Sequence, residues 1–346
     1  MPLYRAYGLK IDSELELPEL EPADDDGSSA GSAGSARPAR VASPARAPDL
    51  TIRLGPVPHD GLAGGQQLGP FLWADPANIW LHIPGVARFL ATGGHTITVD
   101  PDPAPGVGPD PDSIRVFLLG SGLGAALCQR GLLVLHGNAV QVGDACMCAV
   151  GHSGTGKSTL AAGFWRRGHT ILADDVVAVD SSCCALPGFP RIKLWQDSAD
   201  KLSVDTAALR RVRPTTNKFN LPVAPARTGA LPLRWVYILD VHNGTDLRLE
   251  PITGLARFTP LHNNTYRVRF LEGMAMKGEH LKLCGQLAGR IRLVKVSRPR
   301  EGFTLDALID ALMADMAEHP APPTGGRAPT SRGGPAHGGG RAPAEP

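Results

Sequence analysis

The residues best suited to chemistry lie in the segment 151–159, which reads GHSGTGKST and fits the pattern G-x-x-x-x-G-K-[ST] at every position. Glycines let a backbone curl around an anion so that successive N–H groups point inward, and a helix beginning near the lysine adds the positive end of its dipole. The lysine of such a loop reaches the β- and γ-phosphates of a nucleotide, and the next hydroxyl joins the coordination of Mg²⁺. The residues expected to bind the nucleotide are Gly151, His152, Ser153, Gly154, Thr155, Gly156, Lys157, Ser158 and Thr159.

A glycine-rich turn that binds nothing is the structural alternative for this segment. The apolar run 145–150 enters it directly and a helix is predicted after it, so strand, loop and helix stand in the order that phosphate binding requires. This order favours the binding interpretation. Because backbone N–H groups make most of the contacts in such a loop, the side chain of His152 is secondary.

Two adjacent carboxylates and a histidine form a second group of candidates. Asp174 and Asp175 end the short apolar strand predicted at 170–173. Neighbouring side chains on an extended chain point to opposite sides, so one carboxylate can take Mg²⁺ while the other approaches an acceptor hydroxyl. His136 ends a predicted strand, and ligands of α/β sheets bind at strand ends. A solvated turn for the aspartates and a structural role for the histidine are the alternatives.

Composition limits the possible partners and compartment. The 346 residues include 41 glycines and 32 prolines, and the formal net charge is only +2, so nothing in the total charge suggests a nucleic-acid or membrane partner. None of the six cysteines stands in a C-x-x-C pair, which favours reduced thiols over a zinc site. The N-terminus lacks the apolar core of a signal peptide. We expect a cytoplasmic protein.

The chain is predicted to be of the α/β class with two units and a tail. A small β-rich unit spans 1–112, opens with a strand at 4–17 and contains a disordered insertion at 21–48 that is poor in large apolar residues. A nucleotide-binding unit spans 113–319, and 320–346 is expected to be a disordered tail. Predicted helices of the second unit are 113–128, 159–167, 197–209 and 305–317, and its predicted strands are 132–140, 170–173, 176–179, 191–194 and 235–239.

The order and spacing of these motifs resemble the catalytic core of the HPr kinase/phosphorylase family. The matching residues are His136-Gly137, the segment 151–158 and the stretch GHTILADD at 168–175, so the resemblance covers about residues 130–180. It implies a phosphate-loop fold related to phosphoenolpyruvate carboxykinase and a kinase that transfers phosphate from ATP to a protein seryl hydroxyl. The resemblance implies that Asp174 is the catalytic base and that His136 is the partner of this base. It also implies that Asp175 and Ser158 bind Mg²⁺ and that Lys157 stabilises charge on the transferred phosphate.

The flanking regions depart from bifunctional HPr kinases. The glycine-rich segment after the aspartate pair and the C-terminal phosphorylase region have no counterpart, which argues against reverse phosphorolysis. Segments 3–18 and 187–195 are more similar to HPr-kinase-like proteins found with peptide-modifying enzymes, including kinases of lasso peptide precursors. This similarity implies a serine of a precursor peptide as acceptor, with HPr itself as an alternative. The hexamers of the family imply a possible homo-oligomer.

Two readings outside the kinase class remain open. One is a nucleotide-binding regulatory or scaffold module without efficient phosphoryl transfer. The other is a carboxykinase-like enzyme, against which the spacing from the helix to the aspartates argues. A kinase also needs a cation from outside the loop. The sequence does not choose among the candidates Lys193, Arg213, Lys218, Arg227 and Arg267.

Overall fold

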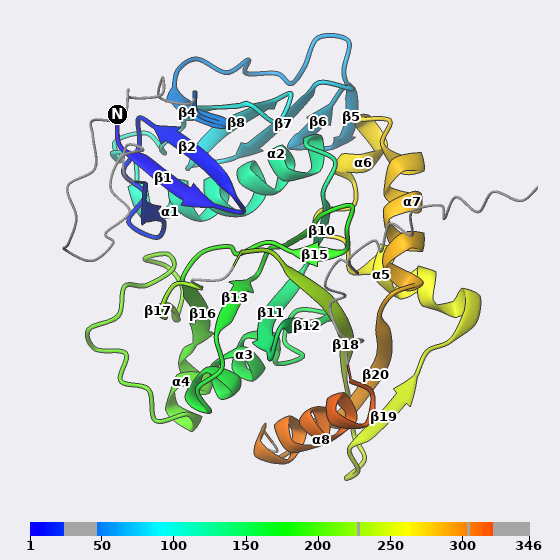
Figure 1. Ribbon diagram of the computed structural model, residues 1–346. Helices are drawn as coiled ribbons and strands as arrows, with labels where there is room; N and C mark the ends of the chain where they lie inside the picture. Colours follow the sequence, from blue (N-terminus) through cyan, green and yellow to red (C-terminus); the bar gives the residue numbers. More distant parts are fainter. Residues whose placement is uncertain (24–46, 227–228, 303–304, 321–346) are drawn as a thin grey trace, which may run out of the picture.

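The computed structural model describes residues 1–23, 47–226, 229–302 and 305–320. These residues form two mixed sheets, a two-stranded ribbon and the helices that cover them, which is a mixed α/β fold (Figure 1). Most of the predicted insertion and all but one residue of the predicted tail lie outside the described residues. Within the described part of the chain, none of the helices combines the length and hydrophobicity that a membrane crossing needs.

The first sheet is built from the N-terminal third of the chain and has nine strands among the described residues. Its strands pair antiparallel except that β4 runs parallel to both β2 and β9. In spatial order the strands are β3 (Glu21–Pro22), β1 (Leu3–Ala6), β2 (Leu9–Ser13), β4 (Leu50–Leu54), β9 (Thr96–Pro101), β8 (Ala87–Thr92), β7 (Asn78–Ile83), β6 (Leu72–Ala74) and β5 (Gln66–Gly69).

Two predictions for this region were wrong in detail. The single strand expected at 4–17 is a hairpin of β1 and β2, because Tyr7 and Gly8 both adopt left-handed backbone angles, with φ of 52° and 71°, and reverse the chain. The insertion does not begin at Glu21, since Glu21 pairs with Arg5 as part of β3. The alternation of apolar and polar residues within a single segment cannot reveal either strand pairing, because each pairing depends on where the partner strand lies.

A nearly continuous helical segment covers one face of the first sheet. It consists of α1 (Pro111–Phe117), a π-helical turn η1 (Leu118–Gly122) and α2 (Leu123–Gln129), as the spacing predicted. Asp110 caps α1 by accepting a hydrogen bond from the backbone N–H of Asp112 at 3.1 Å, and Pro111 occupies the first helical position. The helix packs its apolar face into the same core as the sheet. Val116, Phe117 and Ser121 of this segment line a cavity that His136 also lines.

The residues of the candidate site lie at the ends of strands in the second sheet. Its strands follow the order β10 (Leu133–Leu135), β14 (Val177–Val179), β15 (Cys184–Ala185), β18 (Leu231–His242), β12 (Ala145–Gly151), β11 (Gly137–Val142) and β13 (Ile171–Asp174), with β20 (Arg292–Pro299) beside β18 and β19 (Arg248–Pro251) beside β20. Strands β12, β18 and β20 are parallel, whereas β11 is antiparallel to both β12 and β13. The beginning of β11 therefore lies where β12 and β13 end.

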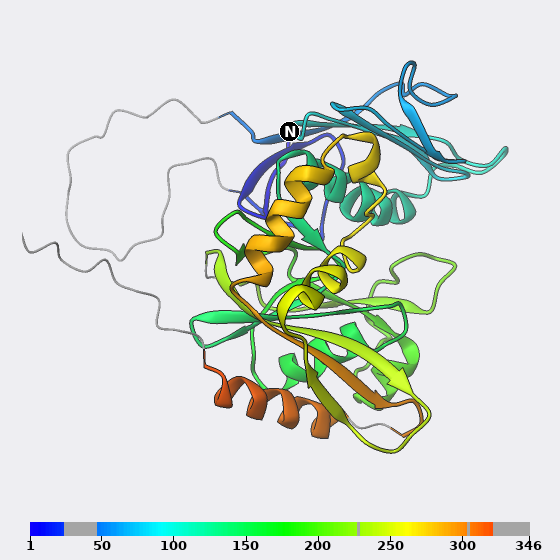
Figure 2. The ribbon, with the colours of Figure 1, turned by 90° about the vertical axis from the view of Figure 1, so that its right-hand side faces the viewer.

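Two of the helices that cover this sheet were predicted from the periodicity of the sequence. Helix α3 (Lys157–Arg166) follows the glycine-rich loop, and α8 (Leu305–Glu318) packs beside it, which Figure 2 shows from the side. Their close approach needs Gly163, because a Cβ there would lie 2.7 Å from the Ile309 side chain. The pattern did not indicate η2 (Gly254–Arg257), α5 (Phe258–Asn263), α6 (Phe270–Gly273) and α7 (Lys277–Ala288).

The remaining described structure is a two-stranded ribbon of β16 (Arg191–Trp195) and β17 (Lys218–Pro222), followed after β16 by α4 (Gln196–Lys201). The helix predicted at 197–209 was too long. It ends at Lys201 because Ser203 adopts a left-handed conformation with φ of 52°, and the following residues form turns. The ribbon brings Trp195 and Lys218 opposite each other beside the glycine-rich loop.

Candidate active site

The glycine-rich loop has the backbone geometry that its sequence predicted. Strand β12 ends at Gly151 and α3 begins at Lys157. Gly151, Gly154 and Gly156 have φ of 142°, 86° and 99°, a region that side chains disfavour. A Cβ on Gly151 would also lie 2.4 Å from the carbonyl oxygen of Leu239 on the adjacent strand. The turn and the close packing against β18 both require glycine at this position.

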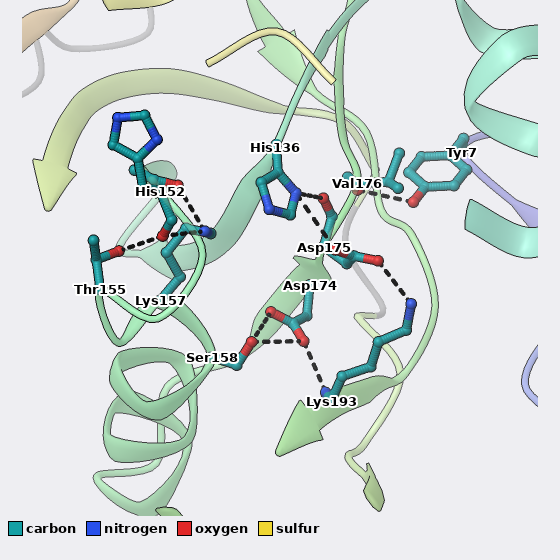
Figure 3. Close-up of polar contacts among 11 residues, drawn as sticks. Tyr7, His136, His152, Thr155, Lys157, Ser158, Asp174, Asp175, Val176 and Lys193 are labelled. Carbon is teal, nitrogen blue, oxygen red and sulfur yellow. Dashed lines mark hydrogen bonds and ion pairs between the residues drawn. The ribbon is translucent and has the colours of Figure 1, made fainter. Parts of the chain in front are cut away.

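Lys157 lies across this loop rather than extending away from it. Its Nζ donates to the carbonyl oxygens of Gly151 at 2.7 Å and His152 at 3.0 Å (Figure 3). Asn138, the second residue of β11, donates from Nδ2 to the Lys157 carbonyl oxygen at 2.5 Å and anchors the first turn of α3. Burial lowers the pKa of Lys157, while the carboxylates of Asp175 and Asp174 oppose that shift. The ammonium group therefore sits at the loop, close to two negative charges.

Asp174 is the last residue of β13 and points to the start of α3. Its carboxylate accepts hydrogen bonds from Ser158 Oγ at 3.1 Å and from the backbone N–H of Lys193 at 2.8 Å. The side chain is buried, and burial raises its pKa, with the Lys193 N–H opposing the shift. A buried carboxylate beside a hydroxyl supplies oxygen ligands of the kind that Mg²⁺ prefers. The described residues contain no cluster of three or more His, Cys, Asp or Glu side chains that would hold a metal by themselves.

Asp175 points to the opposite side, towards His136. Its backbone has a φ of 78°, an unusual left-handed conformation for a residue other than glycine. Oδ2 accepts a hydrogen bond from Lys193 Nζ at 2.7 Å, and Oδ1 lies 3.4 Å from His136 Nδ1. Burial by itself raises the pKa of Asp175, but the ammonium group of Lys193 lowers it by more, so that the pKa falls well below its usual range. The carboxylate is therefore ionised at neutral pH.

His136 forms a bend between β10 and β11. This bend interrupts the strand that was predicted at 132–140. Its Nδ1 lies 3.1 Å from the carbonyl oxygen of Asp175. Burial lowers the pKa of His136, and the Asp175 carboxylate only partly opposes this. The ring is thus neutral at neutral pH, with Nδ1–H donating to the Asp175 carbonyl oxygen.

These contacts pair the predicted residues differently from the expectation. The resemblance placed His136 with Asp174 and Ser158 with Asp175, whereas the structure joins His136 to Asp175 and Ser158 to Asp174. The physical reason is the strand direction: Asp174 still belongs to β13 and faces α3, and the left-handed turn at Asp175 sends the next carboxylate to the other face. Lys193 separates the two groups by donating its backbone N–H to one carboxylate and its ammonium to the other (Figure 3).

Three adjoining cavities surround these residues. The His136 cavity, of about 480 Å³, is lined by His136, Asp175, Lys193, by residues 151–153 of the glycine-rich loop, and by residues of 116–121 and 263–267 that include Tyr266. The loop cavity, of about 250 Å³, is lined by the glycine-rich loop, both aspartates and Lys218. The Arg298 cavity, of about 260 Å³, lies against the loop and includes Arg298. The sequence analysis gave no role to Tyr266, Arg298 or Trp195. Trp195 ends the segment 187–195 named above, and the other two residues belong to no motif.

The structure separates the candidate cations that the sequence left equivalent. Lys193 and Arg267 line the His136 cavity, and Lys218 lines the loop cavity. Arg213 instead donates to Ser113 Oγ at 3.2 Å and lies over the Phe117 ring. Arg227 lies outside the described residues. Lys218 is thus the candidate that shares a cavity with the loop, Ser158 and both aspartates.

Comparison with known proteins gives a limited result. No profile of a known protein family matches the sequence, and no curated protein matches it. Among solved structures the chain is similar to the Hpr(Ser) kinase/phosphatase from Coxiella burnetii, at 14% sequence identity, over 54% of this chain and 91% of that chain, with a TM-score of 0.27. The structural similarity thus extends over half the chain at low identity. At this TM-score it supports neither a shared mechanism nor a shared substrate.

Proposed function

We propose that this protein is an ATP- and Mg²⁺-dependent kinase that transfers the γ-phosphate to a hydroxyl, a serine of a peptide or protein. The observation that carries the proposal is the division of the two adjacent carboxylates between the Ser158 hydroxyl and His136. Asp174 lies at the loop hydroxyl, where a metal would bind, and Asp175 also lines the adjoining His136 cavity, which is large enough for an acceptor. Each half of a phosphoryl transfer then has its own group.

The donor side uses the loop, Lys157, Ser158 and Asp174. The backbone N–H groups of the loop and the beginning of α3 favour the phosphates, and Lys157 lies close enough to exchange its carbonyl partners for phosphate oxygens. Ser158 and Asp174 fit Mg²⁺ because both present oxygen atoms and a cation would offset the burial that raises the Asp174 pKa. Bound Mg²⁺ would neutralise charge on the β- and γ-phosphates.

The acceptor side uses Asp175, His136 and Lys193. As the acceptor oxygen bonds to the γ-phosphorus and the bridging β–γ bond breaks to release ADP, Asp175 accepts the hydroxyl proton. Lys193 keeps this carboxylate ionised, and neutral His136 holds its backbone in position. Lys218, from the ribbon, is placed to stabilise charge on the transferred group. These roles exchange the two aspartates relative to the family resemblance.

The volume of the His136 cavity supports an acceptor larger than a single hydroxyl. At about 480 Å³ it lies within the ~300–1,000 Å³ range of typical ligand sites. Asn263, Asn264 and Thr265 line it with groups that can hydrogen-bond a peptide. A ribosomally made precursor peptide of the lasso type is the acceptor that we propose first, with HPr as the second.

Mass spectrometry after incubation with ATP, Mg²⁺ and a pool of candidate acceptors tests the proposal. We expect a gain of one phosphate on a serine that is lost in Lys157→Ala. Nucleotide binding without transfer to any acceptor would contradict the kinase assignment and favour a regulatory module. A pool that contains HPr and precursor peptides separately distinguishes the two acceptor classes.

A further inference from the structure

The Arg298 cavity has no role in the proposed transfer, yet it is continuous with the loop cavity. The two cavities share five lining residues, which are Gly154, Gly156, Thr159, Trp195 and Ser198. The loop cavity shares His136, Ser153 and Asp175 with the His136 cavity. No residue lines both the His136 cavity and the Arg298 cavity in the described chain. The loop cavity therefore lies between the other two.

This arrangement gives the cleft a direction. If the loop holds the phosphates, as the proposed function requires, the terminal phosphate must face Asp175 and the His136 cavity. The rest of the donor then leaves the loop at the other end, where the Arg298 cavity opens. From this geometry we propose that the Arg298 cavity binds the nucleoside of the phosphate donor, with Trp195 stacking on the base.

Trp195 has the exposure and support that a stacking residue needs. The four residues before it in β16 are buried, whereas Trp195 is 50% exposed and lines both cavities. A half-exposed indole is stabilised when an aromatic base stacks on its face. Lys218 lies opposite Trp195 across the ribbon, with Nζ 5.4 Å from the ring centroid. Purines offer a larger face than pyrimidines, so we expect a preference for purine nucleotides.

Arg298 joins the cavity to the loop. Its Nε and Nη2 donate to the Thr155 carbonyl oxygen at 3.2 and 3.0 Å, and Nη2 would lie 3.1 Å from a Cβ built on Gly156. Arg300 and Lys201 also line the cavity. These cations favour the phosphate that is nearest the nucleoside, at the point where the nucleotide leaves the loop. Arg298 is a positioning residue for the loop, because its donors already hold a loop carbonyl.

Calorimetric titration of the full chain with Mg²⁺ and either ADP or inorganic pyrophosphate separates this subsite from the phosphate loop. We expect wild type to bind ADP more tightly than pyrophosphate. Trp195→Ala should weaken ADP binding about tenfold, the loss expected when one base no longer stacks, and should leave pyrophosphate binding unchanged. Trp195→Phe should restore most of the ADP affinity. Phe71 is an exposed aromatic in the turn between β5 and β6, and Phe71→Ala should change the affinity for neither ligand.

Each other outcome has a defined meaning. Equal affinity of wild type for ADP and pyrophosphate, or equal weakening of both in Trp195→Ala, overturns the nucleoside subsite and leaves the kinase proposal standing. Tighter ADP binding that depends on Trp195, in a protein that phosphorylates no acceptor, supports the subsite and contradicts the kinase. Failure of wild type to bind either ligand overturns both. Tryptophan fluorescence gives a second readout. ADP should quench the indole emission of Trp195, which is identified by its absence in Trp195→Phe, and pyrophosphate should not.

Discussion

The hydroxyl of Ser158 donates to the carboxylate of Asp174 at 3.1 Å, across the boundary between α3 and β13. The neighbouring Asp175 contacts His136 and Lys193 instead. One peptide unit thus separates a carboxylate suited to a metal from one suited to a proton. This division, together with the cavities around it, determines what substitutions on each side should do to nucleotide binding and to transfer.

Asp175→Asn should abolish transfer and keep nucleotide binding. The amide cannot accept the acceptor proton, and loss of a general base costs about 10²–10⁴-fold in rate. The dissociation constant for ADP with Mg²⁺ should stay near that of wild type. Turnover measured beside ADP affinity decides the matter, and a variant that retains wild-type turnover would remove Asp175 from the chemistry.

Asp174→Asn should weaken Mg²⁺-dependent nucleotide binding about 10- to 100-fold, because a carboxylate ligand is lost. The folded-state pKa of Asp174 is raised above its unfolded value, so its charge costs stability at neutral pH and the cost disappears below the unfolded pKa. The neutral amide can still accept from Ser158 and Lys193. We therefore expect a higher melting temperature at pH 7 together with the weaker binding. A lower melting temperature would argue against this electrostatic picture.

Lys193→Met should move the acid limb of the activity profile to higher pH. Lys193 lowers the pKa of Asp175, and its removal leaves burial, which raises that pKa, less opposed. A base with a higher pKa loses its ionised form at a higher pH. Turnover measured from about pH 4 to 8 tests this, with Lys295→Met as the control because Lys295 pairs with Asp240 on the surface at 3.3 Å. Unchanged profiles for both variants would refute the coupling.

Lys218→Met should lower turnover by ~10²-fold and change ADP affinity little, as expected for a cation that acts mainly on the transferred group. Lys282→Met is the matched control, since Lys282 pairs with Glu279 on the surface of α7 at 3.7 Å and lines none of the three cavities. Steady-state kinetics with both variants compares the two positions. Equal losses in the two variants would deny Lys218 a specific role.

Gly124→Ala should raise the acceptor KM several-fold without affecting ADP binding. A Cβ on Gly124 would lie 2.9 Å from the Tyr266 ring, which lines the His136 cavity. Relief of that overlap displaces the ring, at a cost of about 1–3 kcal/mol in stability. Gly278→Ala is a suitable control because, apart from its chain neighbours and its own helix backbone, no atom of the described structure lies within 4 Å of the position that its Cβ would occupy. An unchanged acceptor KM would place the acceptor elsewhere.

Local features of the site were predictable from the sequence because short-range physics determines them. The segment 151–159 specifies glycines for positive φ, a lysine and a hydroxyl at the start of a helix, and the structure confirms the strand, loop and helix order. The helices at 111–129, 157–166 and 305–318 follow from apolar spacing. Alternation along an extended chain predicts opposite directions for Asp174 and Asp175, and their carboxylates do point to opposite sides, although Asp175 itself is not extended. The nucleotide, the acceptor and the residues' roles stay predictions.

Only the tertiary structure decided which aspartate meets which partner. The antiparallel register of β11 with β12 and β13 brings His136, the loop and the aspartates to one edge, and the left-handed turn at Asp175 directs the second carboxylate to His136. Trp195, Lys218 and Arg298 reach the same cleft from a ribbon and a strand far away in the chain. Sequence spacing carries no record of such contacts, because strand register and packing depend on the whole buried surface and not on neighbouring residues.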